Sequence, residues 1–423
     1  MKKRTYRKIA INQFQPETVM KLVPKGKLVF AVDVAKVDMV AAFADERGQA
    51  VAFIAWKNPV ENAQLLAVLA RLRDEGYQVE AVMESSGTYG DVLRHQLIEA
   101  AVPVFRVGGK RTHDAREIYD GVPSLHDAKC AAIIAKLHAE GISAPWPAAS
   151  VEKRNLRAAI DRMDLHQERY LQLVHRLESW LARHWPELPE LIELTSATLL
   201  ALLGRIGGPS QVAAAPEEAR RLMRGMSHQL MDVAKIDRVI ESASRSAGVP
   251  MLDLERETLM AIADEAQRSL RAFTTAKTSL ETLSVQTHAQ RMAPTVGKTT
   301  AAVFAAFVGD PSLFHSSAAY VKAFGMNLKE KSSGKLQGHL KITKRGSGRA
   351  RQYLWLAVCR WVKQDPIARA WYQRKIARDA GKRAKAIVAL MRKLAGALYH
   401  IGRGDPYDAT KLFAVKHLEV APA

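Results

Sequence analysis

The sequence predicts an α/β domain followed by mostly helical regions, and three observations support this fold class. Residues 27–56 contain three apolar runs of strand length that are separated by turn residues. Residues 151–185 and 254–290 lack glycine and proline and repeat apolar residues at three- and four-residue steps, which predicts long helices. After residue 322 the chain becomes strongly basic, which indicates a separate C-terminal domain.

The chain has 423 residues, of which 48% are apolar and 25% charged, a balance typical of a folded protein with two or three domains. We expect a flexible basic tail over 1–25, an α/β domain over 26–147, a helical or coiled-coil region over 148–290 and a C-terminal domain over 291–423. No apolar stretch is long enough to cross a bilayer, and the N-terminus lacks the apolar core of a secretion signal. Two cysteines cannot form a disulfide framework, so we predict a cytoplasmic location.

The order of elements predicts the fold of the N-terminal domain. Three strands over 27–56 form an antiparallel meander, after which helices and strands alternate. The later elements are a helix over 60–75, a strand over 78–86, a helix from Tyr89, a strand over 102–107 and a helix over 126–140. This order, βββαβαβα, is that of the ribonuclease H fold, in which helices flank a mixed sheet.

Three carboxylates occupy positions where that fold brings its elements together. Asp33 lies in the first strand, where alternation directs it away from Val32 and Val34. Glu84 ends the fourth strand, and Asp127 begins the last helix. Mg²⁺ prefers carboxylate oxygens and completes its shell with water and phosphate oxygens, and a pair of such ions promotes phosphodiester cleavage. The sequence therefore predicts a Mg²⁺ site of the nuclease type at these three residues.

Positive charge is concentrated near the C-terminal end. Residues 322–403 contain 21 basic and three acidic residues, whereas the remaining chain is nearly neutral. Such a field attracts polyanions, while a surface that only improves solubility usually mixes both signs. We therefore predict that this region binds DNA or RNA. The residues expected to contact phosphates are Lys329, Lys331, Lys335, Lys341, Lys344, Arg345, Arg349 and Arg351.

The two long predicted helices leave two interpretations open. Their apolar residues, among them Leu156, Ile160, Leu259 and Ile262, recur at the spacing of one helical face. The helices either pair as a coiled-coil arm or serve as core helices of a bundle. Residues 186–253, which lie between them, carry no pattern that indicates a function.

Five blocks of sequence resemble those of a known family. They are FAVDVAK from Phe30, ESSGTYG from Glu84, DAKCAAIIA from Asp127, PTVGKTTA from Pro294, and the stretch 320–355 with its SSGK and ITKRG sequences. In this order they resemble the two signatures of the IS110 family of insertion-sequence transposases, whose relatives include the Piv DNA invertase. The resemblance covers most of 27–140 and 291–405.

The resemblance implies a RuvC-like ribonuclease H domain with four acidic ligands for Mg²⁺, and a serine that attacks DNA to form a covalent phosphoserine link. The serine directly before the glycine of the second signature is Ser333, and its neighbour is Ser332. A hydroxyl needs help to lose its proton, so the acidic and serine regions are expected to meet in the working assembly. The resemblance also implies a structured bridge RNA as guide, and a dimer or tetramer.

One position departs from the pattern of the family. The fourth acid, in the last helix of the N-terminal domain, is replaced by Cys130, and a thiol is a soft group that suits Mg²⁺ poorly. Three outcomes are open: the site binds metal more weakly, it recruits Asp120 or His126, or it lacks activity. We expect Cys130 to have a structural role.

The sequence therefore predicts a DNA transposase or site-specific recombinase. One alternative is a relative that binds nucleic acid without catalysis, which Cys130 favours. The presence of Asp33, Glu84, Asp127 and Ser333 opposes that alternative. A RuvC-like junction nuclease without serine chemistry is a third hypothesis, disfavoured by the second signature.

Overall fold

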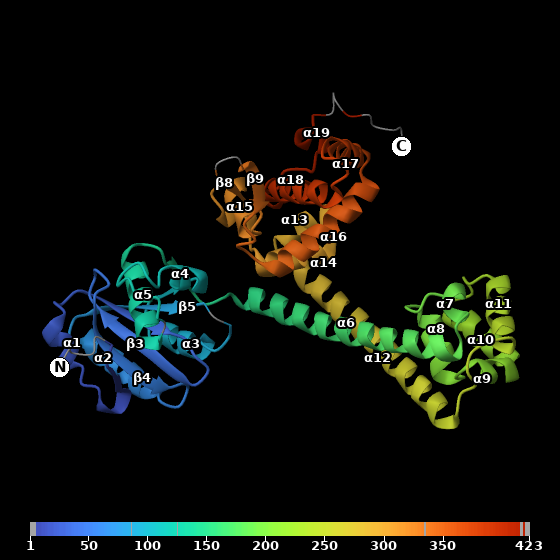
Figure 1. Cartoon of the computed structure of the whole chain (residues 1–423), viewed down its shortest axis with the longest axis horizontal. Helices are drawn as coiled ribbons and strands as arrows, with labels where there is room; N and C mark the ends of the chain where they lie inside the picture. Colours follow the sequence, from blue (N-terminus) through green and yellow to red (C-terminus); the bar gives the residue numbers. More distant parts are fainter. Residues whose placement is uncertain (1–5, 86, 125, 334–335, 415–417, 419–423) are drawn as a thin grey trace. The chain divides into compact units, whose positions relative to one another are not determined.

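The computed structural model describes residues 6–85, 87–124, 126–333, 336–414 and 418. The chain divides into two compact units, Met1–Ala149 and Ser150–Ala423, which are described separately below (Figure 1). The first is an α/β unit and the second is almost entirely helical, so the predicted mixture of an α/β sheet and many helices is confirmed. Within the described ranges, no helix is both long and apolar enough to cross a membrane.

The first unit is built on a mixed sheet. Its strands are β1 (Lys8–Ala10), β2 (Lys27–Asp33), β3 (Asp38–Ala44), β4 (Ala50–Lys57), β5 (Gln78–Glu84), β6 (Val104–Val107) and β7 (Ala144–Pro145). Among the described residues the strands lie in the order β1-β4-β3-β2-β5-β6-β7. Strands β2, β3 and β4 form the predicted antiparallel meander, and β2, β5 and β6 run parallel to one another. The carboxyl ends of β2 and β5 therefore lie at the same edge of the sheet.

Helices cover both faces of the central strands, which explains why β2 is apolar along almost its whole length. Leu28, Phe30 and Val32 pack with α2 (Asn62–Asp74) and α3 (Asp91–Glu99). Val29 and Ala31 point the other way and pack with α5 (Asp127–Ala139). Because Asp33 continues this second set, alternation places its side chain on the α5 side of the sheet.

Residues 6–25 differ from the flexible tail that the sequence analysis expected. They form β1, a short 3-10 helix over Ile11–Gln13 and α1 (Glu17–Leu22). Phe14 and Val19 are buried in the core of the unit, and the Phe14 ring stacks on Phe43 with centroids 5.3 Å apart. Strand β1 pairs in parallel with β4, so this segment extends the sheet at one edge.

The second unit contains two hydrophobic cores connected by a pair of long helices. Helices α6 (Val151–His184) and α12 (Asp253–Val285) pack side by side (Figure 1). One core contains Tyr170 and Leu181 of α6 and Leu259 of α12. It also includes residues of α7 (Leu188–Leu191), α8 (Ala197–Arg205), α9 (Pro209–Ala214), α10 (Pro216–Met226) and α11 (Val233–Ser244). The two helices are thus both a paired arm and part of the cores at its ends.

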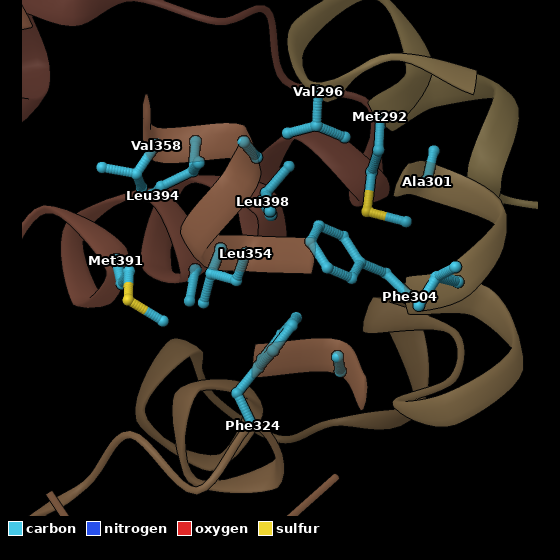
Figure 2. Packing of buried hydrophobic residues seen from close by; sticks show 14 of the residues in the cluster. Met292, Val296, Ala301, Phe304, Phe324, Leu354, Val358, Met391, Leu394 and Leu398 are labelled. Carbon is cyan, nitrogen blue, oxygen red and sulfur yellow. The ribbon is translucent and has the colours of Figure 1, made fainter. Parts of the chain in front are cut away.

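The other core lies at the C-terminal end of the chain. Its elements are α13 (Ala289–Val296), α14 (Lys298–Phe307), a 3-10 helix (Pro311–Leu313), α15 (Ser317–Ala323), the hairpin β8 (Leu328–Ser333) and β9 (Leu336–Ile342), α16 (Gly348–Gln364), α17 (Pro366–Arg378), α18 (Arg383–Arg403) and α19 (Ala409–Leu412). Figure 2 shows Phe304, Phe324, Leu354 and Leu398 converging from four separate segments. This core holds α15 and α16, the helices that precede and follow the basic hairpin in the chain.

The ITKRG sequence ends in a glycine that packs directly against backbone. A β carbon at Gly346 would lie 2.3 Å from the carbonyl oxygen of Ala323 and 2.5 Å from the amide nitrogen of Gly325. Gly325 itself has φ +72°, a conformation that side chains rarely adopt. The segment that follows the hairpin therefore packs against the end of α15 at Gly346 and Gly325, which are distant in sequence but in contact in the fold.

Gly346→Ala should therefore destabilise the second unit by about 2–4 kcal/mol, because rigid backbone atoms must move to accept the methyl group. Thermal unfolding would show this as a lower midpoint. Gly225→Ala is a suitable control, because Gly225 lies in α10 and a β carbon there would meet nothing within 4 Å. That change is expected to leave stability the same or raise it slightly. Equal midpoints for the two variants would contradict the packing described here.

Candidate active site

The three predicted carboxylates are carried by elements that meet at one edge of the first unit. Asp33 is the last residue of β2, Glu84 is the last of β5 and Asp127 is the first of α5. Strands β2 and β5 are parallel neighbours. Glu84 shares the face of Val82, which packs against α5. The fold thus brings all three residues to the same side of the sheet.

The charges of these residues affect one another. The pKa of Asp33 is raised to about 7 by burial, and in addition by the negative charges of Glu84 and Asp127. The pKa of the Cys130 thiol is raised to about 11 by burial and by the same three carboxylates. Asp33, Glu84, Asp127 and Cys130 therefore share one electrostatic neighbourhood, which we call the acidic centre.

The carboxylate oxygens of the acidic centre are the type of ligand that a hard divalent cation prefers. Burial raises the pKa of Asp33, and the negative charges of Glu84 and Asp127 raise it further; a cation would relieve this repulsion between the carboxylates. In the part of the chain that the structure describes, however, no three His, Cys, Asp or Glu side chains already surround a common point closely enough to hold a metal ion. The three carboxylates are close enough to affect one another's charge but are not arranged as a complete metal site. Metal binding would therefore require their side chains to move closer together.

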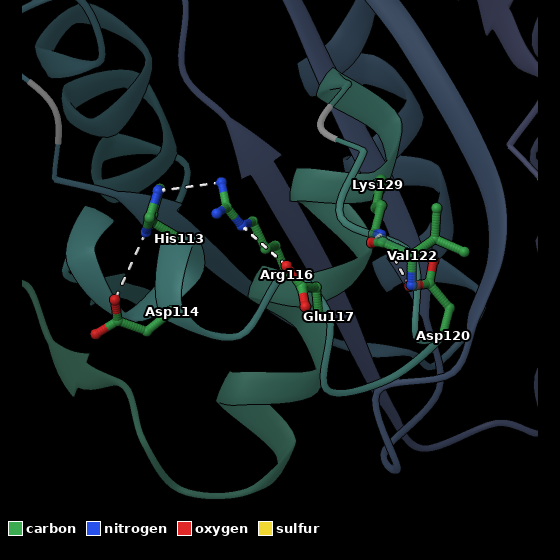
Figure 3. A network of polar contacts seen from close by, with 7 residues as sticks. All are labelled: His113, Asp114, Arg116, Glu117, Asp120, Val122 and Lys129. Carbon is green, nitrogen blue, oxygen red and sulfur yellow. Dashed lines mark hydrogen bonds and ion pairs between the residues drawn. The ribbon is translucent and has the colours of Figure 1, made fainter.

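The two residues proposed as substitutes for the missing acid are engaged elsewhere. Asp120 accepts a hydrogen bond from the Lys129 ammonium at 2.8 Å and one from the Tyr6 hydroxyl at 3.3 Å. Lys129 is only 3% exposed and also donates to the carbonyl oxygen of Val122 at 2.5 Å (Figure 3). The Nδ1 atom of His126 accepts the backbone N–H of Lys129 and caps the start of α5. Both residues therefore stabilise the beginning of α5.

Cys130 lies on α5, three residues after Asp127, and is half-buried. Because the pKa of its thiol is raised, the thiol stays protonated at neutral pH and is a poor ligand for Mg²⁺. A carboxylate at this position would join the acidic centre.

Cys130→Asp is expected to raise the affinity of the protein for Mg²⁺ or Mn²⁺ by about tenfold, because it adds an oxygen ligand and a negative charge. Calorimetric titration with Mn²⁺ would measure the change. Cys359→Asp serves as the control for introducing an acid in place of a cysteine, because Cys359 lies on α16 in the other unit. Unchanged metal affinity in Cys130→Asp would mean that the native ligand set is already complete.

Gly109, at the start of α4 (Gly109–Asp114), has a role that the sequence analysis did not identify. A β carbon at this position would lie 2.6 Å from Oε1 of Glu84. The absence of a side chain therefore makes room for the Glu84 carboxylate. Only the folded arrangement brings position 109 against the end of β5, so no local pattern in the sequence indicates this contact.

Gly109→Ala should displace the Glu84 carboxylate and weaken metal binding by about 10- to 100-fold, the usual effect of disturbing groups that orient a metal ligand. The adjacent Gly108 offers a matched control. It has φ −77°, and a β carbon there would meet nothing within 4 Å. Gly108→Ala is thus expected to behave like the wild type. Similar metal affinities for the two alanine variants would show that Gly109 does not position Glu84.

The predicted nucleophile lies at the tip of the basic hairpin in the second unit. Ser333 is the last residue of β8 and pairs with Leu336 of β9, but its side chain lies outside the described residues, as does that of Lys331. Residue 335, the predicted phosphate ligand Lys335, also lies outside them. The Ser332 hydroxyl donates to the Glu330 carboxylate at 2.5 Å and accepts the backbone N–H of Gly338 at 3.4 Å. Ser332 therefore links the two strands near the tip.

The remaining predicted phosphate ligands divide into two groups. Lys329, Lys341 and Lys344 line a groove of about 670 Å³ between the hairpin and α18, together with Lys385 and Arg392 of α18. Arg345 is exposed at the end of the hairpin. In contrast, Arg349 is paired with Asp164 of α6, and Arg351 donates to the carbonyl oxygens of Phe324 and Gly346. The second group stabilises the fold, which the sequence alone did not indicate.

Two family models match the chain. One is described as a transposase and carries the DEDD label of IS110 elements; it matches residues 30–186, which contain all three carboxylates. The fold and the acidic centre thus belong to a protein of the transposase class. The other is described as the transposase IS116/IS110/IS902 family and matches residues 290–373, which contain the basic hairpin. The chain belongs to the IS110 family of transposases. No curated protein matches it significantly.

Proposed function

We propose that this transposase cuts and rejoins DNA with Mg²⁺ held by Asp33, Glu84 and Asp127 and with Ser333 as the nucleophile, guided by a bridge RNA. The observation that carries the proposal is the acidic centre. Burial raises the pKa of Asp33, and the negative charges of Glu84 and Asp127 raise it further, so carboxylates from β2, β5 and α5 lie near one another at one edge of the sheet. A chain that used this edge only for structure would gain nothing from such mutual repulsion.

The strand order supports a RuvC-like ribonuclease H domain. A three-stranded antiparallel meander is followed by two strands, β5 and β6, that run parallel to its first strand. Helix α5 then returns across the sheet on the side of the carboxylates. This arrangement is the one that the sequence analysis expected to gather the acids.

The proposed reaction begins when the Ser333 hydroxyl attacks a phosphorus atom of DNA. An oxygen–phosphorus bond to serine forms, the bond from phosphorus to a sugar oxygen breaks, and the sugar oxygen gains a proton. Attack by another DNA hydroxyl then reverses these steps and releases the serine. Bound Mg²⁺ would lower the pKa of the attacking hydroxyl and stabilise the developing charge on the phosphate. Lys329 and Lys341, which pair across the hairpin, would hold neighbouring phosphates.

The serine and the acidic centre belong to different units, so the proposal requires the two units to come together on DNA. They would do so within one chain or between subunits of a dimer or tetramer. The basic residues around the hairpin are consistent with a guide RNA. When the RNA recognises the DNA sequence by base pairing, the protein mainly contacts the phosphate backbones of the nucleic acids. The groove between the hairpin and α18 is lined by six basic residues, the five named above and Lys375 of α17.

A second candidate function is that of a relative that binds nucleic acid without cutting it. The presence of Cys130, whose raised pKa keeps it from acting as a ligand, favours this candidate. The two candidates differ in one measurable property, because only an active recombinase changes the connectivity of DNA.

The test is to produce the protein together with the DNA that flanks its gene and to sequence any RNA that copurifies. The purified complex is then incubated with supercoiled plasmids that carry donor and target sites, in Mg²⁺ or in a chelator. We expect a discrete flank-encoded RNA and joined plasmids in Mg²⁺ only. RNA binding without joined plasmids or protein–DNA adducts would support the second candidate. Joining in the chelator would contradict the role of the metal.

A further inference from the structure

The N-terminal segment contacts the acidic centre through a lysine. Strand β1 pairs with β4 in parallel, with Lys8 opposite Phe53. This pairing places the Lys8 ammonium 3.4 Å from Oδ2 of Asp127. Lys8 lies in the segment predicted to be a flexible tail, yet its contact is with one of the three proposed metal ligands.

The placement of Lys8 is stabilised by its neighbour Tyr6. The Tyr6 ring lies 4.9 Å from the ring of His126, which caps α5, and 5.7 Å from the ring of Phe53. The Tyr6 hydroxyl donates to Asp120. The segment is therefore anchored by a strand pairing, by two ring contacts and by a hydrogen bond, all at or beside the first turn of α5.

The ion pair between Lys8 and Asp127 is open to solvent. The two side chains are 52% and 56% exposed, and exposed pairs of this kind contribute at most about 1 kcal/mol. Such a pair adds little to stability and exchanges its partner easily. Its position matters more than its strength, because a cation that binds Asp127 would compete with the ammonium of Lys8 for the carboxylate.

We propose that Lys8 is a positioning residue. Its ammonium neutralises the charge of Asp127 before metal binds, and once metal is bound it pairs with a phosphate of the DNA instead. The inference rests on the proposed function, since it assigns a partner to one of the same carboxylates. If Asp127 held Mg²⁺, phosphate oxygens of the DNA would be suitable ligands for the remaining positions around the ion. The Lys8 ammonium, which contacts Asp127 in the absence of metal, would then be available to contact such an oxygen.

The proposal makes two predictions that a purely structural ion pair would not. Lys8→Met removes the competitor for Asp127, so Mn²⁺ should bind about two- to fivefold more tightly in the absence of DNA. The same variant loses one phosphate contact. With Ca²⁺ present, the slope of log affinity for duplex DNA against log salt should therefore become shallower by about 0.9. Lys8→Arg keeps the charge and should resemble the wild type in both measurements.

Lys25→Met provides a matched control. Lys25 lies in the same N-terminal segment and forms an exposed ion pair with Glu75 at 3.8 Å, which involves none of the carboxylates of the acidic centre. We expect this variant to change neither metal affinity nor the salt slope, while thermal unfolding verifies that both variants fold. Unchanged or weaker Mn²⁺ binding by Lys8→Met would overturn the inference but leave the proposed metal site intact. A wild-type protein without Mn²⁺ binding that depends on Asp33 would overturn both.

Discussion

Ser333→Ala should abolish DNA strand transfer, with a loss of at least about 10³-fold, because the variant lacks the oxygen that forms the bond to phosphorus. RNA and DNA binding should stay within about twofold of the wild type. The hairpin would still carry Lys329 and Lys341, and Ser332 would still link its strands. The measurements are plasmid joining and the yield of covalent protein–DNA adduct on a denaturing gel.

Ser332→Ala is the matched control for the adjacent hydroxyl. It removes the hydrogen bonds to Glu330 and Gly338, so it should loosen the hairpin and reduce the rate of joining by less than about tenfold. The adduct should still form. If Ser332→Ala formed no adduct while Ser333→Ala did, the role of nucleophile would belong to Ser332.

Asp33→Asn should remove metal-dependent activity and, at the same time, stabilise the metal-free protein. The pKa of Asp33 is raised from 3.8 to about 7 in the folded state. The folded protein therefore holds its proton more tightly than the unfolded chain, and the resulting stability is lost as the pH rises from about 4 through 7. Asparagine is never ionised, so it avoids this loss.

The stabilisation expected at pH 8 is at most about 4 kcal/mol, and less because solvent screens a partly exposed group. At pH 4 the two proteins should differ little. Thermal unfolding in a chelator at the two pH values measures the difference. Asp38→Asn, an exposed change at the start of β3, is the control and should alter neither stability nor metal binding. A similar gain at both pH values would show that the ionisation of Asp33 is not its cause.

The sequence was most informative where periodicity and fold geometry act together. The apolar runs of 27–56 indicate the meander, and alternation along β2 correctly places Asp33 opposite the face of Phe30 and Val32. The order of elements then predicts that the ends of β2, β5 and the start of α5 meet. These inferences succeed because backbone alternation and strand direction leave few alternatives.

Contacts between distant segments were not predictable in the same way. Strand β1 has only three residues and forms because the edge of β4 is free to accept it. Gly109 is recognised only through its contact with Glu84. Arg349 and Arg351 have the same local sequence character as the lysines of the hairpin, but Asp164 and two carbonyl groups engage them. Charge alone cannot distinguish a residue that binds phosphate from one that joins two helices.

The prediction of Ser333 as the nucleophile has a different basis. Nothing in the sequence KSSGK distinguishes it from an ordinary basic loop, and Ser333 is singled out only by its match to the signature of the family. A hydroxyl has no local pattern that reveals its reactivity, because the groups that activate it lie elsewhere in the sequence.

Helices α7 to α11 leave the long helix pair and return to it at nearly the same place. The backbone N–H of Val249 donates to the carbonyl oxygen of Arg183 at 2.9 Å, and Nδ1 of His184 lies 2.7 Å from the carbonyl oxygen of Val249. A segment whose two ends meet can be exchanged for another of different length without altering the elements on either side. Residues 186–248 meet this condition at their ends, but their helices share a hydrophobic core with Tyr170, Leu181 and Leu259 of the long pair. A replacement segment would therefore have to cover the same apolar faces of α6 and α12.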